Sequence, residues 1–245
     1  MDRSIVMITK KGIVNVNYTV WEDLKIMYLS SDILFDQIFK FVFTNSSISN
    51  PITITQDDIT YGKIDNLSEW KVFMIKQHPV NRFLDVYMRF CQKYREKNAV
   101  KCLNCFADLN CIISRVYEVI EKKSRNVMNK LYYEDYFFPY TWKFSPIEGV
   151  DINIIDMEND NQMKFRIGKE LIHFNISNNI IKDTFNIISN FSKSYTERKK
   201  NIRRKLNRES LYYSKVLLRK FSSMYFCDFI YFGFDIPQFK KLMYF

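Results

Sequence analysis

The chain has 245 residues, a hydrophobic fraction of 47% and a formal net charge of +10. This length supports one sizeable core, so a single domain over residues 1–245 is predicted, and the hydrophobic content excludes a disordered tail. No run of about 18 apolar residues is present, which excludes a membrane-spanning segment, and residues 1–20 lack the apolar core of a signal peptide. The charge favours a polyanionic partner, namely nucleic acid, an acidic membrane surface or a sulfated or carboxylated polysaccharide; the alternative is a solvated basic surface without such a partner.

The N-terminal quarter is predicted to contain two strands, at 5–8 and 13–16, and then two helices. Thr19 is a suitable N-cap for the first helix, and apolar residues follow at helical spacing: Trp21, Leu24, Met27 and Tyr28. Ser31 can cap the second helix, which is apolar as far as Val42. Residues 45–66 are rich in Ser, Thr, Asn and Asp, which predicts a loop with one short strand.

The centre of the chain predicts a strand, a turn and a helix in direct succession. Residues 70–76 form a short apolar run of the kind found in buried strands. The turn covers residues 77–82, and Pro79 suits the first turn of a helix. Residues 83–94 then carry apolar side chains on one helical face. A turn at a helix N-terminus offers backbone N–H groups to an anion.

The remaining elements alternate between helix and strand. Helices are predicted at 108–123, at 167–173, from Asn178 or Asn179 through 189, and at 209–232 with Gly233 as the stop. An aromatic loop covers 132–142, a strand covers 151–157, and residues 194–208 are strongly basic. Strands separated by helices predict an α/β fold with a mostly parallel sheet.

Four cysteines lie close together in the sequence: Cys91, Cys102, Cys105 and Cys111. A four-thiolate zinc site would use the C-x-x-C pair, but no second such pair follows at zinc-ribbon spacing. Two local disulfides are the favoured alternative and require an oxidising compartment. Cys227 lies in an apolar helix and is predicted to be a buried free thiol. Five N-x-[ST] sequons also permit a lumenal location, at Asn17, Asn45, Asn66, Asn175 and Asn190.

Four segments together resemble the carbohydrate sulfotransferases of the Golgi, the group of chondroitin sulfotransferases and their divergent invertebrate relatives. Residues 73–87 are similar to the family pattern Arg-x-Pro-x-x-Arg-x-x-Ser-x-Tyr after an apolar strand. The four clustered cysteines, with 108–109 between two of them, are similar to the family cluster. Residues 137–142 resemble Phe-Pro-Gln-x-Trp, and 227–234 resemble Tyr-x-Asp-Phe-x-x-Phe-Gly-Phe.

The resemblance implies a P-loop-like sulfotransferase fold with a mostly parallel central sheet flanked by helices and a cysteine-rich helical excursion. It also implies Golgi or secretory localisation and the donor 3′-phosphoadenosine 5′-phosphosulfate (PAPS). The acceptor would be a hydroxyl of a chondroitin-type glycosaminoglycan. Sulfuryl transfer by in-line displacement needs cations and backbone donors around the leaving phosphate and a base at the acceptor hydroxyl.

The resemblance places the donor site at five positions: Asn15, Thr19, Gln77, Arg82 and Asp85. Three depart from the family pattern, since Asn15 stands for a Lys, Gln77 for an Arg and Asp85 for a Ser. Gln77 keeps a hydrogen-bond donor but loses the charge, and Asp85 brings a negative charge close to a phosphate. Donor binding and activity are therefore expected to be feeble.

The sequence leaves the roles of several charged and polar residues open. The basic residues Arg198, Arg203 and Arg204 are candidates for glycan binding, with an exposed helical face as the alternative. Arg82 either pairs with a carboxylate or binds an anion, and His78 and Asp228 are expected to cap or pack. No catalytic base is identified; Glu134 and Asp135 are only nearby. The competing functions are an inactive scaffold that binds glycan or a partner, and a basic nucleic-acid-binding protein.

Overall fold

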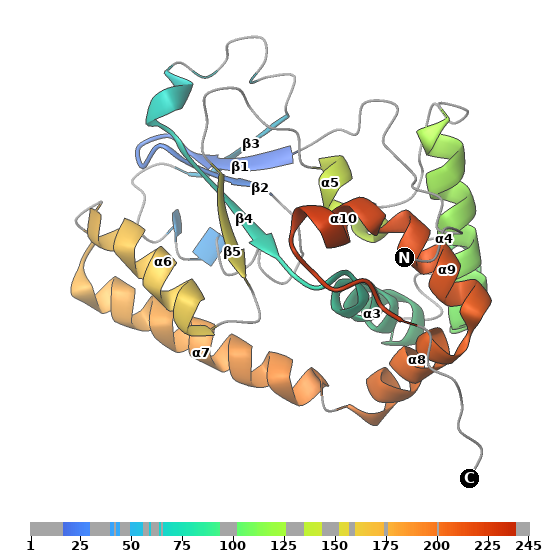
Figure 1. Ribbon diagram of the computed structural model, residues 1–245. Coiled ribbons are helices and arrows are strands. Elements are labelled where there is room, and N and C mark those ends of the chain that lie inside the picture. The colour runs from blue at the N-terminus through green and yellow to red at the C-terminus, as the bar shows by residue number, and fades with distance from the viewer. Residues whose placement is uncertain are drawn as a thin grey trace. The chain divides into compact units, whose positions relative to one another are not determined.

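The computed structural model (Figure 1) describes residues 17–29, 40–41, 43–44, 50–55, 59, 64, 66–93, 102–125, 135–143, 152–156, 160–173, 176–199 and 201–238. The chain divides into two compact units. Unit 1 comprises 1–13, 78–142 and 198–245, and unit 2 comprises 14–77 and 143–197. The expectation of one domain stays a prediction, and each unit is described by itself.

Unit 2 contains a five-stranded mixed sheet in the order β3-β1-β2-β4-β5. Its strands are β1 (Asn17–Trp21), β2 (Ile26–Leu29), β3 (Ile52–Thr55), β4 (Lys71–Lys76) and β5 (Ile152–Asp156). The β1 strand pairs antiparallel with β2 and with β3, whereas β4 pairs parallel with β2 and with β5. The α/β class and the strands at 70–76 and 151–157 are therefore confirmed, but the sheet is mixed and not mostly parallel.

The helix predicted after Thr19 is wrong, because this segment forms the β1–β2 hairpin. Lys25 adopts a left-handed conformation with φ 49°, and its N–H donates to the Glu22 carbonyl, which reverses the chain. All four residues of β2 are buried. A strand that is covered on both faces shows a continuous apolar run, and such a run also satisfies helical spacing.

Two helices, α6 (Asp160–His173) and α7 (Asn178–Lys199), are drawn in yellow and orange in Figure 1. Both contribute apolar residues to one buried cluster with the sheet. Met163, Ile167 and Leu171 of α6 join Ile155 of β5 in one buried cluster. Both helices are longer than predicted. Polar residues within α6 and at the end of α7 hid these extensions from the apolar periodicity.

The first helix among the described residues of unit 1 is α3 (Pro79–Tyr87), which continues as the π-helix η2 (Met88–Lys93). The next helix, α4 (Leu109–Ser124), starts at Asp108, whose carboxylate accepts the backbone N–H groups of Asn110 and Cys111. Disulfides join Cys91 to Cys102 and Cys105 to Cys111, with Cα–Cα distances of 5.5 and 5.4 Å. The preference for disulfides over a zinc site is thus confirmed in this helical region.

The long helix predicted at 209–232 is divided into three: α8 (Ile202–Tyr213), α9 (Lys215–Met224) and α10 (Phe226–Tyr231). Ser214 ends α8 and caps α9 through its side chain, which accepts the Leu217 N–H. Gly233, with φ 69°, ends α10 as predicted, because glycine adopts this conformation without a Cβ penalty.

The shorter elements are η1 (Leu67–Glu69), η3 (Asp135–Phe137) and α5 (Tyr140–Lys143). Within the described part of the chain, no helix is both long enough and apolar enough to cross a bilayer. The predicted strands at 5–8 and 13–16 and the helix start at Ser31 lie outside the described residues.

Candidate functional site

Two arginines of α8 reach α3 and form a polar cluster with Asn81 and Asp85, hereafter the α3–α8 cluster. The Arg204 guanidinium binds the Asp85 carboxylate through both terminal nitrogens, with Nη2 3.3 Å from Oδ2. The same Nη2 donates to the Asn81 carbonyl at 3.0 Å. Arg208 donates to the Asn81 side-chain oxygen. Two cations of one helix therefore converge on one carboxylate and one amide of the other.

Local sequence and burial both fix this cluster. The Asn201 side chain caps α8 by accepting the backbone N–H groups of Arg203 and Arg204. This cap places Arg204 in the first turn of the helix. The Arg204 side chain is 2% exposed and that of Asp85 is 10% exposed. A buried guanidinium needs a paired anion, because an uncompensated charge there would cost several kcal/mol. Asp85 supplies that anion from within the chain.

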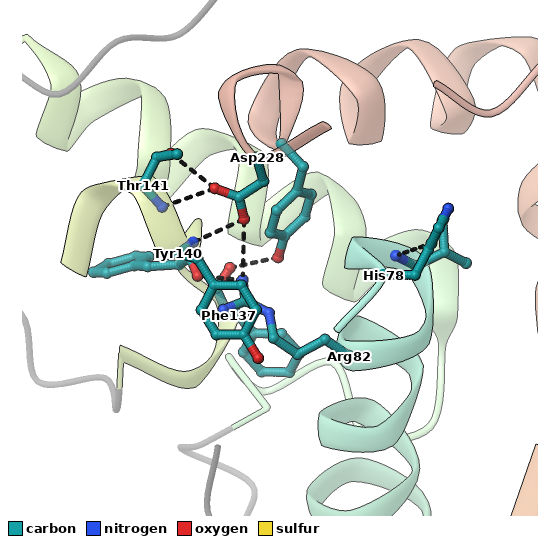
Figure 2. A network of polar contacts seen from close by, with 9 residues as sticks. His78, Arg82, Phe137, Tyr140, Thr141 and Asp228 are labelled. Carbon is teal, nitrogen blue, oxygen red and sulfur yellow. Dashed lines mark hydrogen bonds and ion pairs between the residues drawn. The ribbon is translucent and has the colours of Figure 1, made fainter. Parts of the chain in front are cut away.

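A second network surrounds Arg82 of α3 (Figure 2). Asp228 of α10 accepts the N–H groups of Tyr140 and Thr141 at 2.7 and 2.8 Å, and also the Thr141 hydroxyl at 2.7 Å. Arg82 Nη2 lies 3.8 Å from Asp228 Oδ2 and donates to the Phe138 carbonyl. Its guanidinium carbon lies 3.8 Å from the centre of the Tyr140 ring. Asp228 thus caps the short helix α5 and pairs with Arg82, which confirms the pairing roles expected for both.

Burial dominates the electrostatics of this second network. It raises the pKa of the Asp228 carboxyl, while Arg82 and the hydrogen bonds from Thr141 and Tyr140 oppose that shift. Burial also raises the pKa of Tyr225, whose hydroxyl donates to the Phe137 carbonyl. The network joins α3, the segment around α5 and α10 within unit 1. Its burial and the pairing of Arg82 with Asp228 indicate a structural role.

His78 occupies the turn before α3 and has the capping and packing roles expected for it. Its Nδ1 accepts the Val80 N–H at 3.3 Å, which caps α3 at the N-terminus (Figure 2). The ring packs against Phe229 and Phe234, with centroids 5.7 and 5.3 Å apart. Because Nδ1 accepts a hydrogen bond, the neutral ring carries its proton on Nε2.

The four described positions predicted to contact the donor lie in different settings. Thr19 lies within β1, where it pairs with Tyr28 and Thr53, and is 5% exposed. The expectation of a strand-to-helix turn at this residue is therefore wrong, and Asn15 lies outside the described residues. Gln77 is fully buried directly after β4. Arg82 and Asp85, both on α3, belong to the two different networks described above.

The predicted glycan-binding arginines differ in environment. Arg203 is exposed in the first turn of α8. Arg204 is 1% exposed and paired with Asp85, so its assignment to an external glycan is wrong for this arrangement. Arg198 lies in the last turn of α7, and its side chain is outside the described parts. Asp135 begins η3, whereas Glu134 is outside the described residues.

Sequence reasoning missed Asn81 and Arg208 as members of the α3–α8 cluster. The spacing of Arg204 and Arg208 was a usable signal, because residues four apart lie on the same helical face. Nothing in the local sequence indicated which face of α8 would meet α3, since Arg204 and Asp85 are 119 residues apart.

Cys227 is free and half-buried next to Asp228. Burial raises the pKa of its thiol, and the Asp228 charge adds to this shift. A higher pKa leaves less thiolate at a given pH, so the alkylation rate should still be rising above pH 9.0, the ordinary value. Iodoacetamide alkylation followed by mass spectrometry across pH, without reductant, measures this.

The matched control for this prediction is the same chain unfolded in urea with its disulfides intact. Unfolding exposes Cys227, so the pH midpoint of its alkylation should fall to the value of an ordinary cysteine. Equal midpoints for the folded and unfolded chains would contradict the effect of partial burial on the pKa of this thiol.

Comparisons with known protein families, with curated proteins and with solved structures find no match to this chain.

Proposed function

We propose that this protein is a carbohydrate sulfotransferase-like protein of the secretory pathway with a weakened donor site. It would transfer the sulfuryl group of PAPS feebly to a hydroxyl of a chondroitin-type glycosaminoglycan. The observation that carries the proposal is the ion pair between Asp85 and Arg204. The resemblance assigns position 85 to the donor's 3′-phosphate, and here an internal carboxylate at that position already neutralises a buried arginine.

The proposal draws support from the order of elements around this position. The apolar strand β4, the turn with Pro79 and the helix α3 follow one another as the resemblance requires. The two disulfides and the capping of α5 by Asp228 involve the other three segments that carry the resemblance.

The expected weakening follows from charge. A carboxylate about 4 Å from a phosphate costs about 1–4 kcal/mol per unit charge in a partly wet site. Replacing Arg by Gln at position 77 removes a charge-assisted hydrogen bond of roughly 1.5–3 kcal/mol. Together these terms lower donor affinity by several orders of magnitude if they add.

The helices α8 and α9 of unit 1 carry exposed cations that could bind an acidic acceptor polysaccharide. Arg203 and Lys205 on α8 are exposed, as are Lys215 and Arg219 on α9. Exposed cations attract a polyanion over several ångströms in a salt-dependent way. Arg203 is therefore retained as a glycan-binding residue of the proposal.

The alternative is an inactive scaffold that binds glycan or a partner. The same ion pair favours this alternative, because Asp85 already supplies the anion that would otherwise come from the phosphate of PAPS. The third reading, a basic nucleic-acid-binding protein, expects reduced cysteines. Two disulfides favour an oxidising compartment instead.

Calorimetric titration with adenosine 3′,5′-bisphosphate, the desulfated donor nucleotide, tests the proposal together with a transfer assay on desulfated chondroitin. We expect weak, millimolar-range binding and slow transfer. Micromolar affinity would refute the weakened donor site. No nucleotide binding and no transfer, with salt-sensitive chondroitin binding retained, would favour the inactive scaffold.

A further inference from the structure

The sequon Asn66-Leu67-Ser68 lies at an exposed turn of unit 2 that leads through Glu69 and Trp70 into β4. Asn66 is exposed and adopts a left-handed conformation with φ 51° and ψ 52°. It precedes η1, yet its side chain makes no capping hydrogen bond. Ser68, which supplies the hydroxyl of the sequon, is exposed as well. The amide and the hydroxyl are thus both on the surface.

The other described sequons have less favourable settings. Asn190 is exposed but lies inside α7, where the backbone is held in a regular helix. The sequon at Asn17 has Thr19 as its hydroxyl residue, and Thr19 is buried in β1 between two neighbouring strands. The sequons at Asn45 and Asn175 lie outside the described residues. An N-linked glycan needs an exposed acceptor, typically in a surface loop or turn.

We infer that Asn66 is the N-glycosylation site among the described sequons. The side-chain nitrogen of Asn66 forms a bond to the anomeric carbon of an oligosaccharide carried by a lipid diphosphate. The bond from that carbon to the diphosphate oxygen breaks, the lipid diphosphate leaves with the electron pair, and one amide proton is lost to the transferase base.

The position of Asn66 keeps the glycan away from Gln77, the proposed donor-site residue at the other end of β4. Asn66 precedes the first residue of β4, whereas Gln77 follows its last residue. The six residues of β4 span roughly 17 Å at the usual rise of a strand. Ligands of α/β sheets bind beyond the carboxyl ends of the strands, which is the opposite end from Asn66. Removal of the glycan should therefore leave nucleotide binding unchanged.

The test expresses the full chain in eukaryotic cells behind a cleavable secretion signal, so that its entry into the lumen does not depend on the proposed function. Enzymatic deglycosylation in heavy-oxygen water should convert Asn66 to a mass-labelled aspartate. Ser68→Ala removes the hydroxyl while keeping the left-handed Asn66, so the label at 66 should be lost, and Asn66→Gln should lose it too. Ser68→Thr and Asn190→Gln should retain it.

An unlabelled Asn66 in the secreted wild-type chain, or a label that survives Ser68→Ala, would overturn the assignment. Neither outcome would contradict the sulfotransferase proposal, because that proposal is tested separately, by nucleotide titration of the deglycosylated chain.

Discussion

Asp85→Ser is expected to raise the affinity for adenosine 3′,5′-bisphosphate by roughly 5- to 1,000-fold. The physical reason is the removal of one negative charge about 4 Å from the proposed phosphate position, a repulsion of about 1–4 kcal/mol. The replacement also releases Arg204, which Asp85 neutralises in the wild-type chain. Isothermal titration of the variant and of the wild-type chain measures the change directly.

The same replacement should lower the free energy of unfolding in the absence of ligand. Arg204 is 1% exposed, and removing the partner of a buried ion pair costs about 3–5 kcal/mol. A nucleotide that supplies the missing anion should restore part of this loss. At a concentration of about 100 times its Kd, a ligand adds about 2.7 kcal/mol of stability by mass action. Urea unfolding with and without nucleotide therefore provides a second readout.

A matched control removes an equal charge elsewhere in unit 1. Glu118 of α4 forms an exposed pair with Arg115 at 3.4 Å, and Glu118→Ser should change neither nucleotide affinity nor stability appreciably. If Asp85→Ser and Glu118→Ser bind nucleotide equally, position 85 does not contact the phosphate, and the proposed donor site is misplaced.

Asp228→Asn is expected to destabilise the protein by about 3–5 kcal/mol, because Arg82 would lose its carboxylate in a buried setting. One amide oxygen can replace Oδ1, which accepts both bonds from Thr141. The amide NH₂ would then face the Tyr140 N–H and the Arg82 guanidinium. All of these groups are hydrogen-bond donors, so none could accept from another. The free energy of unfolding in urea, followed by tryptophan fluorescence and circular dichroism, measures the loss.

Thr141→Val provides the graded comparison for this network. It deletes only the hydroxyl bond to Asp228, so a loss of about 1 kcal/mol is expected, while the two backbone donors remain. Equal losses for the two variants, or a loss below 1 kcal/mol for Asp228→Asn, would contradict the role of Asp228 as the shared anion of α5 and Arg82.

Some parts of the fold were predictable because their signals are local. Pro79 at the start of α3, the Asp108 cap of α4 and Gly233 after α10 each act within one turn of their own helix. The apolar run of β4 has the length of a buried strand, and the cysteine spacing favoured two disulfides over a zinc site. These features require no knowledge of distant segments.

Other parts were mispredicted because a local pattern fits two structures. Trp21, Leu24 and Tyr28 satisfy helical spacing, yet the left-handed Lys25 and the pairing of β1 with β2 and β3 make this segment a hairpin. The division of the C-terminal helix at Ser214 is similarly hidden, because Ser214 fits either a helix interior facing solvent or an N-cap.

By itself the sequence determined the α/β class, the strand–turn–helix stretch around Pro79 and the disulfide chemistry of its cysteine cluster. Only the tertiary structure decided which charges meet. It pairs Asp85 with Arg204 and Arg82 with Asp228. The physical reason is that the sequence pattern around a charged residue does not indicate which distant residue will pair with it. Such a pair becomes specified only when packing buries both groups and leaves each as the compensating charge for the other.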